Sequence, residues 1–197
     1  TGERQMKFQK ASETDFHIIQ KFYWDVIDNI HRNNVNNENL GWEKGIYPSD
    51  KFIQSSLIKG ELYTLTEKDT LYACVILNSE HNKGYDNCTW GIICDSGEVL
   101  TPHALAVNPK LQRKGVGKLV VENILNIART EHKKAVRLDV LSACKAAEHL
   151  YTSCGFQFVE TKKCFMKIQG GQSTKCLNLT YKFRFVNQIQ KYPPKNS

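Results

Sequence analysis

A glycine-containing segment in the second half of the chain, residues 112–117 (Gln-Arg-Lys-Gly-Val-Gly), constrains the fold most strongly. It follows the apolar run at residues 104–107 and directly precedes a stretch whose apolar residues recur at helical spacing. Glycines at this spacing let the backbone turn tightly, and a helix that starts at the turn presents unpaired N–H groups and the positive end of its dipole. The pattern therefore predicts a strand, a tight turn and a helix whose N-terminus binds a phosphate or pyrophosphate.

The rest of the chain predicts a mixed sheet. Ser12, with Asp15 three residues on, is expected to cap a first helix, and Ser49 a second that ends near Gly60. Strands are expected at residues 6–11, 61–66, 70–78, 88–94, 98–107, 135–140, 156–163 and 175–185, with further helices after the glycine segment and at 143–153. This order predicts an α/β fold (an α+β mixed sheet) with helices on both faces. We expect one domain over residues 1–186, followed by a polar tail at 187–197.

The net positive charge of the chain indicates what kind of ligand it binds. The net charge is +7, and residues 108–135 carry much of the excess, including Lys110, Arg113, Lys114 and Lys118. This excess predicts an electropositive mouth for a polyanionic ligand. Because no aromatic-rich basic stripe accompanies it, nucleic acid is not the expected partner.

The cysteine pattern and the hydropathy of the chain argue against a metal or disulfide scaffold and against a membrane protein. The seven cysteines include no C-x-x-C pair, which argues against a zinc site and a disulfide framework, so no metal is expected. The chain has no apolar run long enough to cross a membrane and no apolar leader at its N-terminus. We therefore expect a cytoplasmic protein without a membrane partner.

A second motif gives the glycine segment its context. After the helix come Arg137-Leu138-Asp139-Val140 and, some residues later, Leu150-Tyr151-Thr152-Ser153-Cys154-Gly155-Phe156. The Gln-x-x-Gly-x-Gly and Leu-Tyr-x-x-x-Gly-Phe elements, in this order and at this separation, resemble those of the GNAT superfamily of acetyl-CoA-dependent N-acetyltransferases. The resemblance implies a twisted, mostly antiparallel sheet whose fourth and fifth strands splay apart, and Pro102 is consistent with a break in the ladder there.

The resemblance also implies the co-substrate and the residues that bind it. Acetyl-CoA would lie with its pyrophosphate on the glycine segment and its pantetheine arm beside the fourth strand. The residues implied in binding it are Leu105, Ala106, Val107, Gln112, Arg113, Lys114, Gly115, Val116, Gly117 and Lys118. Cys144 stands where relatives often carry an asparagine that contacts the cofactor, and a thiol is a poor substitute for an amide.

Two other phosphate-binding motifs fit less well. A dinucleotide-binding fingerprint needs a third glycine where this chain has Val120. A Walker loop needs four residues between its glycines and a Gly-Lys-Ser/Thr sequence, and the chain has neither.

Two residues are the expected catalytic groups. Tyr151 matches the family tyrosine that acts as general acid on the departing thiolate. His103 is a candidate general base, because an extended strand would place Thr101, His103 and Leu105 on one face and histidine titrates near neutral pH. A packed structural histidine remains the alternative, with Glu98 as a weaker base. Direct attack on the thioester requires no cysteine nucleophile.

The acceptor is expected to be a small-molecule amine or a peptide amine. Trp42, Tyr47 and Trp90 are candidate walls of its site, and the chain is expected to act as a monomer or homodimer. A non-catalytic acyl-CoA-binding or regulatory module on the same fold is the alternative function, since fold does not determine function.

Overall fold

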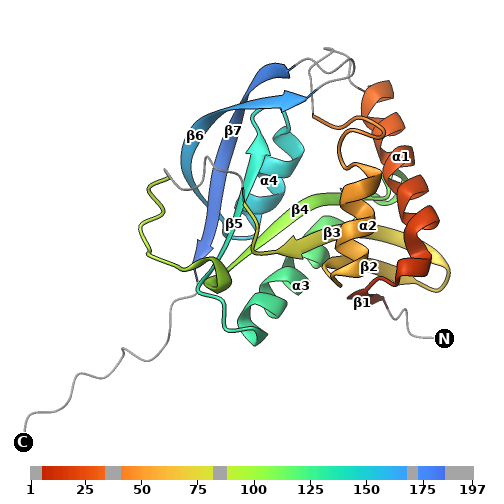
Figure 1. The fold of residues 1–197 in the computed structure, drawn as a ribbon, viewed down its shortest axis with the longest axis horizontal. Coiled ribbons are helices and arrows are strands. Elements are labelled where there is room, and N and C mark those ends of the chain that lie inside the picture. The colour runs from red at the N-terminus through yellow and green to blue at the C-terminus, as the bar shows by residue number, and fades with distance from the viewer. Residues whose placement is uncertain (1–5, 34–40, 82–87, 168–172, 185–197) are drawn as a thin grey trace, which may run out of the picture.

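The computed structural model describes residues 6–33, 41–81, 88–167 and 173–184. A seven-stranded sheet in the order β1-β2-β3-β4-β5-β7-β6 forms its centre (Figure 1), and β4 with β5 is the parallel pair among antiparallel neighbours. The strands are β1 (Lys7–Lys10), β2 (Leu62–Glu67), β3 (Thr70–Asn78), β4 (Val99–Val107), β5 (Ala135–Leu141), β6 (Gln157–Lys167) and β7 (Ser173–Arg184). The α-helices are α1 (Phe16–Asn33), α2 (Asp50–Ile58), α3 (Val116–Thr130) and α4 (Lys145–Ser153). The mixed α/β fold predicted from the sequence is confirmed; the expected tail at 187–197 lies outside the described residues.

Local signals account for the helix starts. Ser12 and Asp15 form the predicted capping box at the short 3-10 turn Glu13–Asp15, from which α1 continues. The Ser49 hydroxyl accepts a 3.2 Å hydrogen bond from the Phe52 N–H and caps α2.

Helices cover both faces of the sheet, as predicted. Helices α1 and α2 pack on one face, and we call this cluster the α1/α2 core. Its members include Ile19, Tyr23, Ile53, Ile76 and Ala106. Helices α3 and α4 pack on the opposite face, in a cluster that we call the α3/α4 core, whose members include Val120, Ile124, Leu138, Val140 and Tyr151.

Strands β4 and β5 separate soon after they start. They pair at Val99–Ala135 and Leu100–Val136, where their register ends. Strand β4 continues to Val107 beside β3, and β5 continues to Leu141 beside β7. A wedge-shaped gap in the ladder, which we call the splay, thus opens directly before Pro102, where the sequence predicted a break.

A bulge in β4 changes which residues share a face. Ala104 has a φ of 48°, and the register with β3 shifts between Cys74 and Ile76. His103 pairs with Ile76 and so lies on the α1/α2 face, whereas Leu105 packs against the α3/α4 core. The expectation that His103 and Leu105 share one face is therefore wrong, because the bulge inserts one residue into the alternation.

A buried tyrosine holds this bulge. The Tyr23 hydroxyl donates a 2.9 Å hydrogen bond to the Ala104 carbonyl, and its side chain is 0% exposed. We expect Tyr23→Phe to lower the free energy of unfolding by about 1–3 kcal/mol, because a buried carbonyl loses its partner. Denaturant unfolding measures this; Tyr63→Phe, which removes the same atom from a half-buried side chain, serves as control. Equal losses in the two variants would contradict the assignment.

The strand expected at residues 88–94 does not form. The structure has irregular backbone there, held by side chains of the sheet rather than by a ladder. The Thr89 N–H donates to the Glu160 carboxylate at 2.8 Å, and the Arg137 guanidinium donates to the Ile92 carbonyl at 3.1 Å. These charged partners satisfy backbone groups that a strand would have paired with backbone.

Candidate active site

The glycine segment forms a left-handed turn into α3. Arg113 has a φ of 60° and Gly115 a φ of 81°, and Gly115 is the N-cap of the helix. The Leu119 N–H donates to the Gly115 carbonyl, so the N–H groups of the three residues before Leu119 precede the first intrahelical bond. Gln112 to Gly115 and Lys118 are exposed, while Val116 is buried. Free amides, a helix dipole and exposed cations at one place fit a pyrophosphate group.

The two glycines have different roles. A Cβ on Gly115 would meet nothing within 4 Å, so the space in front of the segment is open. A Cβ on Gly117 would lie 3.1 Å from Cδ2 of Leu150 and 3.8 Å from Cγ2 of Val107. Gly117 therefore allows α3 to approach α4 and the end of β4, whereas Gly115 supplies the left-handed backbone.

Gly115→Ala is expected to weaken acetyl-CoA binding about tenfold, because the methyl group enters the open space in front of the segment. Strain at the positive φ adds a loss of about 1 kcal/mol in the free energy of unfolding. Gly45→Ala is a matched control, since Gly45 has a φ of +74° and open space but lies before α2. Calorimetric titration and denaturant unfolding of both variants check the prediction; a Gly45→Ala variant with the same loss of affinity would contradict it.

The edge of β4 runs from the bulge toward the glycine segment. Leu105 and Val107 point into the α3/α4 core and Ala106 into the α1/α2 core, so these three side chains secure the strand from both faces. Their backbone beside the splay lies past the last residue of β4 that pairs with β5, Leu100. Cys144 is the N-cap of α4, and its carbonyl accepts from the N–H groups of Ala147 and Glu148.

His103 stands on the β4 side of the splay. Its Nε2 lies 2.9 Å from Oδ1 of Asn78 and 3.0 Å from the Glu80 carbonyl. The Asn78 amide is oriented by its own partners, because Nδ2 donates to Glu61 and Oδ1 accepts from the Glu80 N–H. Two acceptors at Nε2 place the proton there, which leaves Nδ1 of the neutral ring with the lone pair. Burial lowers the pKa of His103 below its usual 6.5, against the opposing effects of the Glu80 carbonyl and Asp139.

Tyr151 reaches the splay from the opposite face. It belongs to α4, is 7% exposed and packs edge-on against Phe156 at 5.4 Å between ring centroids. Burial, with smaller contributions from Tyr47 and Asp139, raises the pKa of Tyr151 well above its usual 10. The phenol therefore stays protonated at neutral pH and is suited to donate rather than accept a proton.

Asp139 is a site residue that the sequence reading missed. Val136, Leu138 and Val140 pack in the α3/α4 core, so Asp139 alternates to the α1/α2 face of β5. His103 and Asp139 each lie three residues beyond the last β4–β5 pair, Leu100–Val136, on the two separating strands. The carboxylate also acts on the pKa of His103, Tyr47 and Tyr151, which agrees with this position. The sequence signal was the single acidic residue of β5, a strand that is otherwise apolar except for Arg137.

Trp42 and Tyr47 come together in the turn before α2, and Trp90 does not join them. The Glu43 and Tyr47 backbones form an isolated bridge around Gly45, and the Trp42 and Tyr47 rings meet edge to face with centroids 5.9 Å apart. Burial raises the pKa of Tyr47, and Asp139 adds to that effect while the Ala104 amide opposes it. Trp90 instead covers the guanidinium of Arg137 at 4.5 Å.

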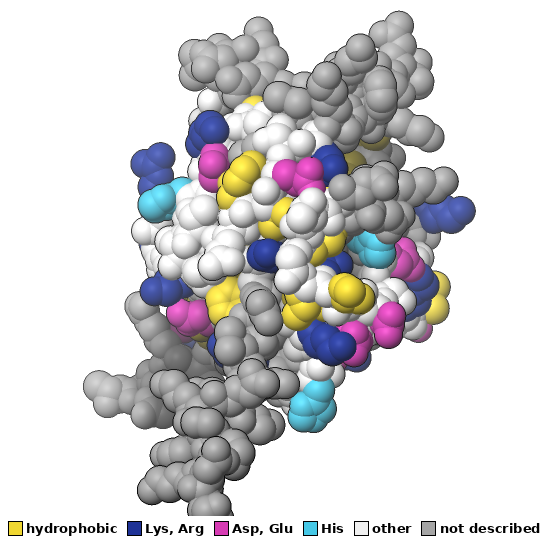
Figure 2. All heavy atoms as spheres, turned by 90° about the vertical axis from the view of Figure 1, so that its left-hand side faces the viewer, with side chains coloured by type: hydrophobic (Ala, Val, Ile, Leu, Met, Phe, Trp, Pro, Cys, Tyr) yellow, Lys and Arg dark blue, Asp and Glu magenta, His cyan; other side chains and the backbone are white. Residues whose placement is uncertain are grey.

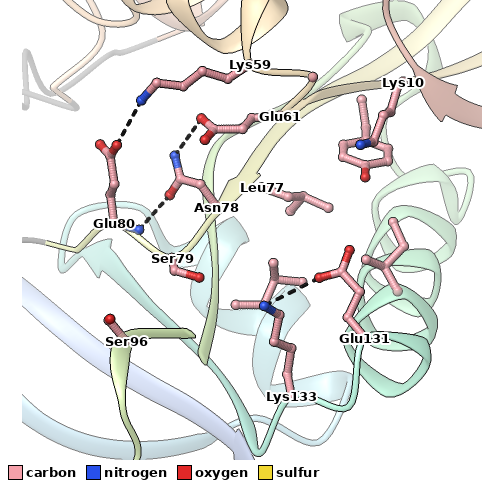
Figure 3. A pocket seen from close by; sticks show the side chains of 14 residues that line it. Lys10, Lys59, Glu61, Leu77, Asn78, Ser79, Glu80, Ser96, Glu131 and Lys133 are labelled. Atoms are coloured by element: carbon pink, nitrogen blue, oxygen red, sulfur yellow. Dashed lines mark hydrogen bonds and ion pairs between the residues drawn. The ribbon is translucent and has the colours of Figure 1, made fainter. Parts of the chain in front are cut away.

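A pocket of about 550 Å³ lies at the other end of α3, where Glu131 lines it. Figure 3 shows Asn78 between Glu61 and the Glu80 backbone in its wall, with Lys59 paired to Glu80 at 3.0 Å. The pocket is thus separate from the glycine segment, and its wall includes the residues that hold His103.

Charges of both signs mix on one face of the molecule. On the face in Figure 2, lysine and arginine side chains are scattered among acidic ones. Part of the basic excess after residue 108 is paired, as in Lys134 with Glu98 at 2.7 Å and Lys133 with Glu131 at 3.5 Å. Of the helices in the described part of the chain, none combines the length and apolar character that a membrane span needs.

Several solved structures share the fold. A GNAT-family acetyltransferase from Streptococcus agalactiae 2603 is 15% identical with a TM-score of 0.71, covering 95% of this chain and 100% of its own. One from Listeria monocytogenes 4b F2365 is 14% identical with a TM-score of 0.70, covering 93% and 97%. The structure of yncA from Salmonella typhimurium, which contains its cofactor acetyl-CoA, is 14% identical with a TM-score of 0.59, covering 93% and 96%.

Curated protein sequences give no match to the chain. The sequence pattern of the acetyltransferase (GNAT) family matches residues 31–156, a range that includes α2, the splay, the glycine segment and Tyr151. Since this match spans well over half of the sequence, the chain belongs to the acetyltransferase (GNAT) family.

Proposed function

We propose that the protein transfers an acetyl group from acetyl-CoA to an amine. The observation that carries this proposal is the splay, which has the glycine segment near one end and places His103, Asp139 and the aromatic rings of the turn before α2 on one face. Tyr151 approaches from the other face. The presence of acetyl-CoA in the similarly folded yncA supports the choice of donor.

The chain offers separate groups to the two ends of acetyl-CoA. The pyrophosphate would lie on the amides and cations of residues 112–118, with Gly115 leaving room for it. The pantetheine arm would pair with the β4 edge at residues 105–107, where backbone beyond the β4–β5 pairing offers donors and acceptors. Cys144, at the start of α4, would neighbour the cofactor on the β5 side.

The protein's task in the reaction is to move two protons. The thioester supplies an activated acyl carbon; the C–N bond forms as the C–S bond breaks. The acceptor must first lose a proton, and neutral His103 can take it on Nδ1, since its Nε2–H is held by Asn78 and Glu80. Tyr151, protonated at neutral pH, can donate to the departing sulfur.

Calorimetric titration with acetyl-CoA tests the first half of the proposal. Saturable binding that is weakened in Gly115→Ala and retained in Gly45→Ala is the expected result. An absence of binding at millimolar acetyl-CoA would overturn the proposal. Binding without release of CoA thiol, across a panel of amines, would favour the alternative of a non-catalytic acyl-CoA-binding module.

A further inference from the structure

Asn78 connects the wall of the pocket at the far end of α3 to His103. Its Oδ1 lies 2.9 Å from Nε2 of His103 and accepts a 3.0 Å hydrogen bond from the Glu80 N–H. Its Nδ2 donates to Oε2 of Glu61 at 3.1 Å, and Figure 3 shows this amide between its two glutamate partners. Both lone pairs of Oδ1 and one hydrogen of Nδ2 are thus engaged. We call Glu61, Asn78, Glu80 and His103 the Asn78 network.

The sheet brings the members of the Asn78 network together. Ile76 of β3 pairs with His103 of β4, and Asn78 lies two residues farther along β3, on the same face of the sheet. Glu61 directly precedes β2, and its carbonyl accepts a 2.8 Å hydrogen bond from the Leu77 N–H, next to Asn78 in the chain. Backbone pairing therefore places Glu61, Asn78 and His103 in series.

The two glutamates give the Asn78 amide a single orientation. The Glu61 carboxylate offers acceptors, so it selects the NH₂ side of the amide, and the Glu80 N–H is a donor, so it selects the oxygen. An amide rotated by half a turn would set oxygen against the carboxylate and N–H against N–H. Oδ1 consequently faces Nε2 of His103, and that nitrogen must carry the proton to bond to it.

Asn78 also holds the second acceptor of the histidine proton. The Glu80 carbonyl lies 3.0 Å from Nε2 of His103, and it belongs to the residue whose N–H bonds to Asn78. The Glu80 carboxylate pairs with Lys59 at 3.0 Å, and the Ser79 hydroxyl donates to the backbone of β4 at 3.0 Å. Loss of the Asn78 amide would therefore remove one acceptor and release the other.

We propose that Asn78 is a positioning residue for His103 and that Glu61 acts through it, so that the imidazole keeps one orientation with its proton on Nε2. The proposal rests on the proposed acetyl transfer, in which Nδ1 takes the proton of the amine. A neutral imidazole can carry its proton on either nitrogen, and only the form with the lone pair on Nδ1 can act as this base. In this role neither Asn78 nor Glu61 exchanges a proton with the acceptor.

The tautomer of His103 can be read by NMR of the protein labelled with isotopic nitrogen in its histidines, without substrates. We expect the Nε2–H form to predominate in the unmodified protein. In Asn78→Leu the ratio of the Nε2–H to the Nδ1–H form should fall at least about fivefold, which corresponds to the loss of one hydrogen bond. Asn123→Leu is the matched control, because the half-buried Asn123 amide donates to the Leu119 carbonyl within α3. An unchanged ratio in Asn78→Leu would overturn the proposal.

The kinetics of Asn78→Leu give a second readout. We expect kcat to fall about tenfold, because the base is no longer held in one orientation, while KM for acetyl-CoA stays unchanged. Asn123→Leu should keep both values. An unchanged kcat, or an equal loss in the control, would contradict a positioning role for Asn78.

Asn78→Asp should shift the pH dependence of kcat while keeping the shape of the side chain. Burial lowers the pKa of His103 in the unmodified protein, against the Glu80 carbonyl and the carboxylates of Asp139, Glu80 and Glu61. A further carboxylate beside Nε2 should raise this pKa, so the acidic limb of kcat should move to higher pH by about 1–3 pH units. A limb at its original pH would show that residue 78 does not act on the ring, and would overturn the proposal.

Two substitutions at Glu61 test its part. Glutamine keeps an acceptor for Nδ2 of Asn78, so Glu61→Gln should keep the tautomer ratio and kcat. Leucine removes the acceptor, so Glu61→Leu should lower kcat about threefold and shift the ratio in the same direction as Asn78→Leu. Equal ratios in the two Glu61 variants would remove Glu61 from the Asn78 network.

These measurements separate the inference from the proposed function. An unchanged tautomer ratio in Asn78→Leu, with acetylation intact in the unmodified protein, overturns the inference alone. If the unmodified protein acetylates no amine, the proposed function fails, and the role of His103 as a positioned base fails with it.

Discussion

Tyr151→Phe is expected to lower kcat by about 100- to 10,000-fold, the range associated with loss of a positioned general acid. The buried phenol is kept protonated by its raised pKa, so it can donate to the departing thiolate throughout the neutral range. Phenylalanine keeps the ring contact with Phe156 and removes only the hydroxyl. Steady-state kinetics at saturating acetyl-CoA and amine measure the loss.

The affinity for acetyl-CoA should change little in this variant, because the glycine segment and the β4 edge are untouched. Tyr72→Phe provides the control, since the Tyr72 hydroxyl bonds to Glu67 at the far end of the β2–β3 hairpin. Undiminished turnover by Tyr151→Phe would remove the residue from the catalytic account without affecting the fold.

His103→Gln is expected to lower kcat by about 100-fold and to change its pH dependence. The glutamine amide can replace Nε2–H toward Asn78 and Glu80, but it cannot take up a proton. Because burial lowers the pKa of His103 below 6.5, its neutral form persists as the pH falls, and the acidic limb of kcat should lie below pH 6.5. Loss of that limb in the variant, measured at saturating substrates, would identify His103 as the base.

An unchanged acidic limb in His103→Gln would contradict the role of His103 as general base.

Local signals in the sequence were sufficient for much of the fold. Serine caps, apolar periodicity and the glycine turn depend on neighbours within a few residues, so Ser12, Ser49 and the start of α3 are where they were expected. The splay was implied by the family resemblance rather than by such a signal, and Pro102 was consistent with it.

The arrangement of the site depended on longer-range effects. Nothing in the run around Ala104 announces a positive φ at a non-glycine residue, yet that bulge moves His103 and Leu105 to opposite faces. The place of Asp139 relative to His103 depends on how β4 and β5 separate after the Leu100–Val136 pair, which a single strand does not reveal. Trp90 was grouped with Trp42 on residue type alone, whereas the structure places it over Arg137.

Turnover of an amine, followed by mass, is the most direct test of acetyl transfer by this protein. The protein is incubated with acetyl-CoA and each member of a panel of amines, and CoA thiol release is followed together with the mass of the amine. The account predicts thiol and N-acetylated amine in equal amounts, at a rate that saturates with acetyl-CoA and is lost in Tyr151→Phe. Binding of acetyl-CoA with neither thiol nor acetylated product, across the whole panel of amines, would contradict it.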